Sequence, residues 1–135
     1  TLPEGVTTIE DYAFYTCAAL EHIELPATIT TIGAGAFMDC RKLRSIVIPE
    51  GVTRINSCTF EYCDVLQSVT LPTSLETMGY GVFSECVALE QVVIPQGVTS
   101  IGDGLFSGCR SLKSVTLPAS LTKVGKTIFV DVLIM

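Results

Sequence analysis

Cysteine is the residue type in this sequence with the widest range of chemistry, and five of the six cysteines recur at one spacing. They stand 23 positions apart, at Cys17, Cys40, Cys63, Cys86 and Cys109. A cysteine can form a disulfide, ligate a metal ion, act as a nucleophile or pack as a small apolar side chain. We call these five residues the cysteine column. The secondary-structure elements that carry them decide which of these roles applies.

The 23-residue spacing extends to two further residue types, of which it includes every copy. The prolines stand at positions 3, 26, 49, 72, 95 and 118, and the phenylalanines at 14, 37, 60, 83, 106 and 129. A fixed period of this length marks a solenoid, in which each repeat is one coil that packs on its neighbours. We predict about six coils over residues 1–135, forming a single segment that we expect to belong to a longer repeat array.

One coil, residues 20–43, shows the elements that the repeat predicts. In residues 20–25 the polar His22 and Glu24 alternate with apolar residues, which is typical of a half-buried strand. Pro26 ends this strand because proline has no N–H to donate. A short extended segment and a turn follow, and we expect a left-handed residue at Gly33, whose column holds Gly79, Gly102, Gly125 and Asn56 in other coils.

The second half of the coil carries the cysteine. Ala36, Phe37, Cys40 and Leu43 follow one another at spacings of one, three and three residues. This spacing places all four side chains on one side of a single helical or 3₁₀ turn. We therefore predict such a turn, with these residues facing inward.

The full motif is Leu-x-x-Ile-x-Leu-Pro, then x-x-Val/Ile-x-x-Ile-Gly, then Ala-Phe-x-x-Cys-x-x-Leu, and residues 20–43 carry it most completely. It resembles the leucine-rich repeat class and, within it, the BspA-type repeat of bacterial and protist surface proteins. The resemblance covers essentially the whole chain. It implies an α/β-type leucine-rich repeat solenoid, mostly β with short helical or 3₁₀ turns. It also implies a cell-surface or secreted protein that binds host or neighbouring-cell proteins.

One column departs from the common leucine-rich pattern, which has Asn or Cys at this place. Here glycine and a hydroxyl residue alternate, as Gly5, Thr28, Gly51, Ser74, Gly97 and Ser120. Two kinds of coil therefore alternate, with a super-period of 46 residues. No physical reason for this super-period is visible in the sequence.

The solenoid argument assigns the cysteine column to the core. Five cysteines cannot all pair within one column, and parallel inward side chains have the wrong direction for disulfides. Zinc would need clustered ligands such as Cys-x-x-Cys, and a nucleophile would need a nearby base, whereas the one histidine, His22, lies on the strand. We expect reduced, buried thiols, with no catalytic residue, metal, cofactor or enzymatic activity.

Cys58 stands outside the column, at a position expected on an exposed turn. Two interpretations remain open at this point. Cys58 is either a tolerated free thiol or a thiol that pairs with another molecule, since exposed thiols oxidise readily.

The outward side of the predicted strands is the candidate binding face. Solenoids bind other molecules on such a face, although period-2 patterning alone would also produce a polar one. No aromatic or arginine cluster lies on it, so no hot spot can be named. The candidate binding residues are His22, Glu24, Arg44, Val47, Gln67, Thr70, Glu90, Gln91, Val93, Lys113 and Thr116.

Charge and composition narrow the function. The net charge is −6 and no basic residues cluster, which argues against nucleic acid as a partner. No apolar run is long enough to insert into a membrane. One hypothesis is a protein–protein interaction module of the adhesion or host-interaction type, with a protein ligand of unknown identity. The alternative is a structural spacer that has no ligand of its own.

The last residues are unusually apolar for a final coil. Val132 and Met135 stand in the cysteine and leucine columns, and Leu133 and Ile134 stand where earlier coils have residues such as Arg41 and Lys42. Three partners could cover them: a further repeat, a second copy of the chain, or the tail folding back. We expect end-to-end self-association through residues 125–135, because exposed edges tend to pair.

Overall fold

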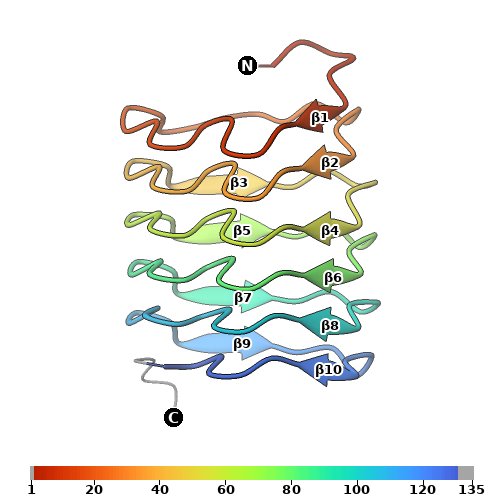
Figure 1. Cartoon of the computed structure of the whole chain (residues 1–135), viewed down its shortest axis with the longest axis vertical. Helices are drawn as coiled ribbons and strands as arrows, with labels where there is room; N and C mark the ends of the chain where they lie inside the picture. Colours follow the sequence, from red (N-terminus) through yellow and green to blue (C-terminus); the bar gives the residue numbers. More distant parts are fainter. Residues whose placement is uncertain (1, 131–135) are drawn as a thin grey trace.

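The computed structural model describes residues 2–130, which form a β-solenoid whose flat coils stack along one axis (Figure 1). The two ends of the chain lie at opposite ends of the stack. Within residues 2–130 the strands are β1 (Thr8–Ile9), β2 (Thr31–Ile32), β3 (Ser45–Val47), β4 (Arg54–Ile55), β5 (Ser68–Thr70), β6 (Thr77–Met78), β7 (Gln91–Val93), β8 (Ser100–Ile101), β9 (Ser114–Thr116) and β10 (Lys123–Val124). The prediction of a repeat solenoid is confirmed.

The strands lie on two sides of the stack, and every strand pair is parallel. The two-residue strands form the sheets β1–β2 and β10–β8–β6–β4. The three-residue strands form the pairs β3–β5 and β7–β9 on the other side, which we call the strand face. We predicted a strand over residues 20–25, but these residues form no strand pairs, although residues 22–24 lie next to β3.

A stack of phenylalanine rings runs through the core. The centroids of neighbouring rings lie 5.2–5.9 Å apart, and the ring planes are within 7° of parallel. The four inner rings are fully buried: Phe37, Phe60, Phe83 and Phe106. Stacked aromatic rings contribute large apolar contacts between consecutive coils. The prediction that this column faces inward is confirmed.

The cysteine column lies beside the rings. Cys40, Cys63, Cys86 and Cys109 are free thiols with no exposed surface, as we predicted, whereas Cys17 in the first coil is half-buried. Each of the four buried thiols also donates a hydrogen bond to a phenylalanine carbonyl in the preceding coil, at 3.0–3.1 Å. The column is therefore both apolar packing and a row of weak donors.

The predicted helical or 3₁₀ turn is wrong, because residues 2–130 contain no helix. Residues 33–43 instead form consecutive turns, in which Ala36 N–H donates to Gly33 C=O and Cys40 N–H to Phe37 C=O. Gly35 and Asp39 are the third residues of these two turns, with φ of 63° and 64°. A left-handed residue at every fourth position interrupts a right-handed helix. The equivalent residues of the other described coils are left-handed too, as Tyr12, Cys58, Gly81, Gly104 and Thr127, and as Thr16, Tyr62, Glu85 and Gly108.

The glycine column that begins at Gly33 has a different cause from the one predicted. Gly33, Gly79, Gly102 and Gly125 do not adopt a positive φ, so the left-handed turn predicted there is wrong. A Cβ atom on Gly33 would lie 2.4 Å from the backbone nitrogen of Asp11, in the preceding coil. These four positions favour glycine because adjacent coils approach closely there.

The alternation of glycine and hydroxyl residues joins the coils in pairs. Gly51 has φ of 104°, and its N–H donates to the Ser74 hydroxyl at 3.0 Å. That hydroxyl donates in turn to the Val52 carbonyl at 2.7 Å. The same clamp joins Gly5 to Thr28 and Gly97 to Ser120. The 46-residue super-period is therefore a two-coil structural unit, which we call a coil pair.

Candidate binding face

Each strand of the strand face presents two side chains to solvent around a central one that faces the core. In β3, Ser45 and Val47 are exposed and Ile46 is buried, and β5 and β7 repeat this pattern. The buried residues pack into the continuous core cluster and fix the backbone. The exposed side chains are therefore held in rows on a rigid base.

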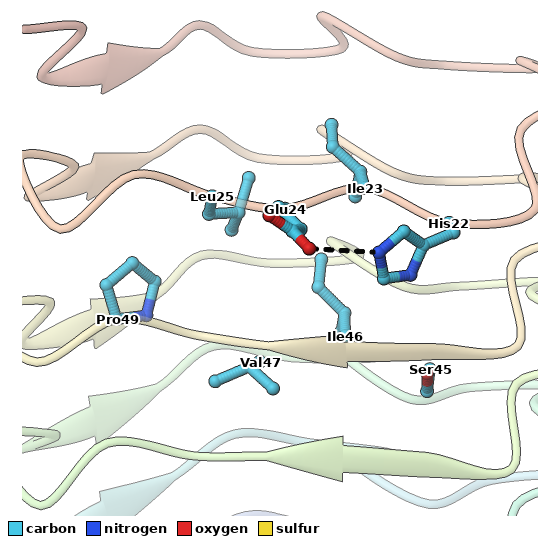
Figure 2. Close-up of a pocket in the computed structure, with 8 residues that line it drawn as sticks. All are labelled: His22, Ile23, Glu24, Leu25, Ser45, Ile46, Val47 and Pro49. Atoms are coloured by element: carbon cyan, nitrogen blue, oxygen red, sulfur yellow. Dashed lines mark ion pairs between the residues drawn. The ribbon is translucent and has the colours of Figure 1, made fainter. Parts of the chain in front are cut away.

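All eleven candidate binding residues are exposed on this face. Two ion pairs join four of them: His22 Nε2 lies 3.7 Å from Glu24 Oε1, and Lys113 Nζ lies 3.7 Å from Glu90 Oε1. Figure 2 shows the imidazole and the carboxylate directed toward each other. Both pairs are largely exposed, so they stabilise the fold little. They leave these side chains free to exchange partners.

The strand face is mostly uncharged toward its centre. Val47 and Val93 are the large apolar side chains there, with exposed fractions of 64% and 61%. They are 46 residues apart, so they occupy equivalent places in two coil pairs. Thr70 and Thr116 are related in the same way. The strand face therefore repeats every two coils.

Two of the grooves on the strand face lie between neighbouring strand segments that do not pair. The first groove has a volume of about 350 Å³ and lies between residues 22–25 and 45–49 (Figure 2). The second groove, of about 590 Å³, lies between β5 and β7 and is lined by Ser68, Val69, Thr70, Leu71, Thr73, Gln91, Val93, Pro95 and Gln96. Six of these lining residues are absent from our predicted binding residues: Ser68, Val69, Leu71, Thr73, Pro95 and Gln96. The valine recurrence at 46 residues was the signal that could have located them.

The thiols show no sign of nucleophilic activation. Burial raises the pKa of the Cys109 thiol to about 12 and the pKa of Cys86 well above its usual value. At Cys58, which is half-buried, burial and the neighbouring Glu61 carboxylate raise the pKa to about 11. No group of three or more His, Cys, Asp or Glu side chains that could hold a metal ion occurs in residues 2–130. No helix in that range is long and apolar enough to cross a membrane.

The comparisons with known proteins agree with this geometry. A family model for the BspA type leucine rich repeat region matches residues 7–134 in six copies. The chain belongs to the BspA-type leucine-rich repeat family. Repeat solenoids of this family are typically non-catalytic. A search of curated proteins found no match.

Solved structures of bacterial leucine-rich repeat proteins are similar to the chain. The T. pallidum leucine-rich repeat protein is 32% identical with a TM-score of 0.76, over 96% of this chain and 72% of that one. A leucine rich cell surface protein from Faecalibacterium prausnitzii is 33% identical with a TM-score of 0.83, over 87% of this chain and 31% of that one. A Eubacterium ventriosum leucine-rich repeat protein is 29% identical with a TM-score of 0.89, over 100% of this chain and 37% of that one.

The region assigned above to self-association is described only in part, because residues 131–135 lie outside the described range. The last described coil exposes several apolar side chains. They are Leu117 (46%), Val124 (56%), Phe129 (44%) and Val130 (43%).

Proposed function

We propose that this chain is a protein–protein interaction module of a cell-surface or secreted leucine-rich repeat protein, of the adhesion or host-interaction type. The observation that carries the proposal is the strand face, a repeating row of exposed side chains on a buried and hydrogen-bonded base. A rigid base lowers the entropy lost when a ligand binds. An extended face of this kind suits a macromolecule better than a small molecule.

The surface location is supported by the family and by one similar protein. The F. prausnitzii protein, 33% identical, is named as a cell surface protein. The BspA-type family match covers nearly the whole chain. We infer that this chain is displayed or secreted in the same way and has no catalytic activity of its own.

A spacer function is the second candidate, and a specific observation favours it. On the side away from the strand face, backbone hydrogen bonds join every pair of consecutive coils, as from Phe37 N–H to Thr59 C=O and from Phe60 N–H to Val82 C=O. Together with the ring stack, these bonds make the solenoid a continuous rod. A rod could hold other domains apart without binding anything itself.

A matched pull-down separates the two functions. The chain would be immobilised and exposed to solubilised host-cell surface proteins, beside two double variants. Thr70→Lys with Thr116→Lys changes the strand face, and Thr31→Lys with Thr99→Lys changes exposed threonines elsewhere on the coils. If the strand face binds proteins, the parent chain and the second variant should retain host proteins that the first variant does not retain. Identical retention by all three chains would favour the spacer.

A further inference from the structure

The strand face is not one continuous sheet. Within a coil pair, Ile48 N–H donates to Thr70 C=O, and Ile94 N–H donates to Thr116 C=O, both at 2.9 Å. Between coil pairs, among the described residues, no backbone hydrogen bond joins β5 to β7. The second groove lies at this break. The first groove lies at the equivalent break between residues 22–25 and 45–49, where, among the described residues, β3 has no strand partner on the side away from β5.

The break leaves main-chain groups without partners. By the 23-residue register, the groups equivalent to Ile48 N–H and Thr70 C=O are Leu71 N–H and Val93 C=O, which make no hydrogen bond to each other. Leu71 is only 9% exposed and lines the second groove together with apolar residues such as Val69 and Val93. Polar groups in such surroundings favour a ligand that can hydrogen-bond with them.

The width of the break limits what can enter. Cα atoms of β5 and β7 approach within 8 Å of one another. A further strand inserted between them would require a separation of about 9.6 Å, twice the usual strand spacing. A ligand must therefore lie along the top of the groove and direct single groups into it.

The lining of the second groove is uncharged throughout. Its apolar part consists of Val69, Leu71, Val93 and Pro95, and its polar part of serine, threonine and glutamine side chains. A charged ligand group would lose its water here and meet no opposite charge. An apolar side chain flanked by peptide groups would meet both the apolar wall and the unpaired donors and acceptors.

We propose that the second groove binds an uncharged, extended peptide segment of a protein ligand. The segment runs along β5 and β7, places an apolar side chain against Val93 and Leu71, and hydrogen-bonds with the free main-chain groups of the break. This proposal rests on the proposed function, since it locates the ligand on the strand face. The first groove is a poorer site for such a segment because His22 and Glu24 line it.

The test is a titration of ¹⁵N-labelled chain with capped pentapeptides, followed by NMR. The probes are acetyl-Thr-Val-Thr-Val-Thr-amide and its counterparts with lysine or glutamate in place of threonine. The neutral peptide is expected to shift the amides of Leu71 and Val93 saturably. Thr70→Lys, which introduces a charge into the groove, should weaken binding at least about tenfold. Thr116→Lys, the same change at the equivalent place in β9, should not weaken it.

Several results would overturn the proposal. One is the absence of a saturable shift with the neutral peptide, and another is an equal weakening of binding by Thr116→Lys. A third is binding of the lysine peptide alone, because that result would indicate attraction to the net charge of −6. Hydrogen exchange checks the premise, since Leu71 N–H should exchange faster than Ile48 N–H and Ile94 N–H. If the pull-down depends on the strand face but the peptides do not bind, the peptide-binding proposal is wrong while the proposed interaction function is still supported.

Discussion

The thiol of Cys86 donates a hydrogen bond to the carbonyl of Phe60 in the preceding coil, with 3.1 Å between sulfur and oxygen. The same carbonyl accepts the N–H of Cys63 at 3.2 Å, so the thiol is its second donor. A valine would fill the space of the thiol but would donate nothing. Cysteine therefore serves this column by combining apolar packing with a weak donor.

Replacing Cys86 by valine measures the worth of that donor. We expect Cys86→Val to lower the free energy of unfolding by about 0.5–1.5 kcal/mol, the usual net value of one hydrogen bond. Cys17→Val is the matched control, because no hydrogen bond from the Cys17 thiol is present among the described residues. Urea unfolding of both variants checks this. Equal losses would show that the column is selected for packing alone.

The buried thiols should make the fold sensitive to alkali. Burial raises the pKa of Cys86 and Cys109 above the usual value of 9.0, so both stay protonated in the folded chain when the unfolded chain ionises. Their stabilising effect is complete below pH 9 and is lost as the pH rises toward their folded pKa, which is about 12 for Cys109. Each such thiol should lower stability by about 1.4 kcal/mol per pH unit in that window. Urea midpoints from pH 8 to 10.5 test this, and Cys109→Val should flatten the slope.

Cys58 behaves differently from the exposed, reactive thiol that its position suggested. It is half-buried with a pKa near 11, so little thiolate is present at neutral pH. We expect slow labelling of native chain by a thiol reagent, with a rate at Cys58 that rises about tenfold per pH unit between pH 7 and 10. Mass spectrometry of labelled peptides gives the site. Fast labelling of Cys58 at pH 7 would contradict the raised pKa.

The clamp between Gly51 and Ser74 predicts a cost for removing one hydroxyl. Ser74→Ala deletes two hydrogen bonds that join the coils of one pair, so we expect a loss of about 1–3 kcal/mol in the free energy of unfolding. Ser114→Ala is the control, since Ser114 is exposed on β9 and its hydroxyl makes no hydrogen bond among the described residues. Thermal or urea unfolding compares them. A loss at Ser114 as large as that at Ser74 would remove the clamp as an explanation of the 46-residue period.

The ring stack predicts that Phe→Ala substitutions in the phenylalanine column lower the free energy of unfolding by unequal amounts. Phe83 is fully buried between two rings at 5.8 and 5.7 Å, so Phe83→Ala should cost about 3–5 kcal/mol. Phe129 contacts one ring and is 44% exposed, so Phe129→Ala should cost much less. Unfolding curves for the two variants check the order. Similar losses would mean that Phe129 is more deeply covered in solution.

The period predicted which residues face the core, because stacking repeats the environment of each column. Phe37, Cys40 and Leu43 are buried as expected. The period did not predict the backbone conformation between these residues. A glycine at position 33 is typical of a turn, yet crowding by the preceding coil is what excludes a Cβ atom there. Residue type alone does not separate these two causes, since both favour glycine.

The sequence did not predict the grooves, for a related reason. Val47 and Val93 were among the predicted binding residues, but the sequence pattern says nothing about which strands hydrogen-bond. The break between β5 and β7 coincides with the clamps, since Ser74 is clamped to Gly51 in the preceding coil and Gly97 in the following coil is clamped to Ser120. Which coils pair is visible only in the stacked structure. The alternation of glycine and hydroxyl residues and the valine recurrence were its traces in the sequence.

We propose that the apolar surface of the last described coil pairs chains end to end. Val124 and Val130 are 56% and 43% exposed there, and within residues 2–130 β10 has a strand partner on one side only. Val124→Lys with Val130→Lys should abolish association, whereas Val47→Lys with Val93→Lys changes two even more exposed valines, on the strand face, and should not. Light scattering over a concentration series gives the mass. We expect the parent and the control to rise above 14.4 kDa with concentration and the end variant to stay there. A parent that remains monomeric at every concentration would leave the tail, residues 131–135, as the better candidate for covering this surface.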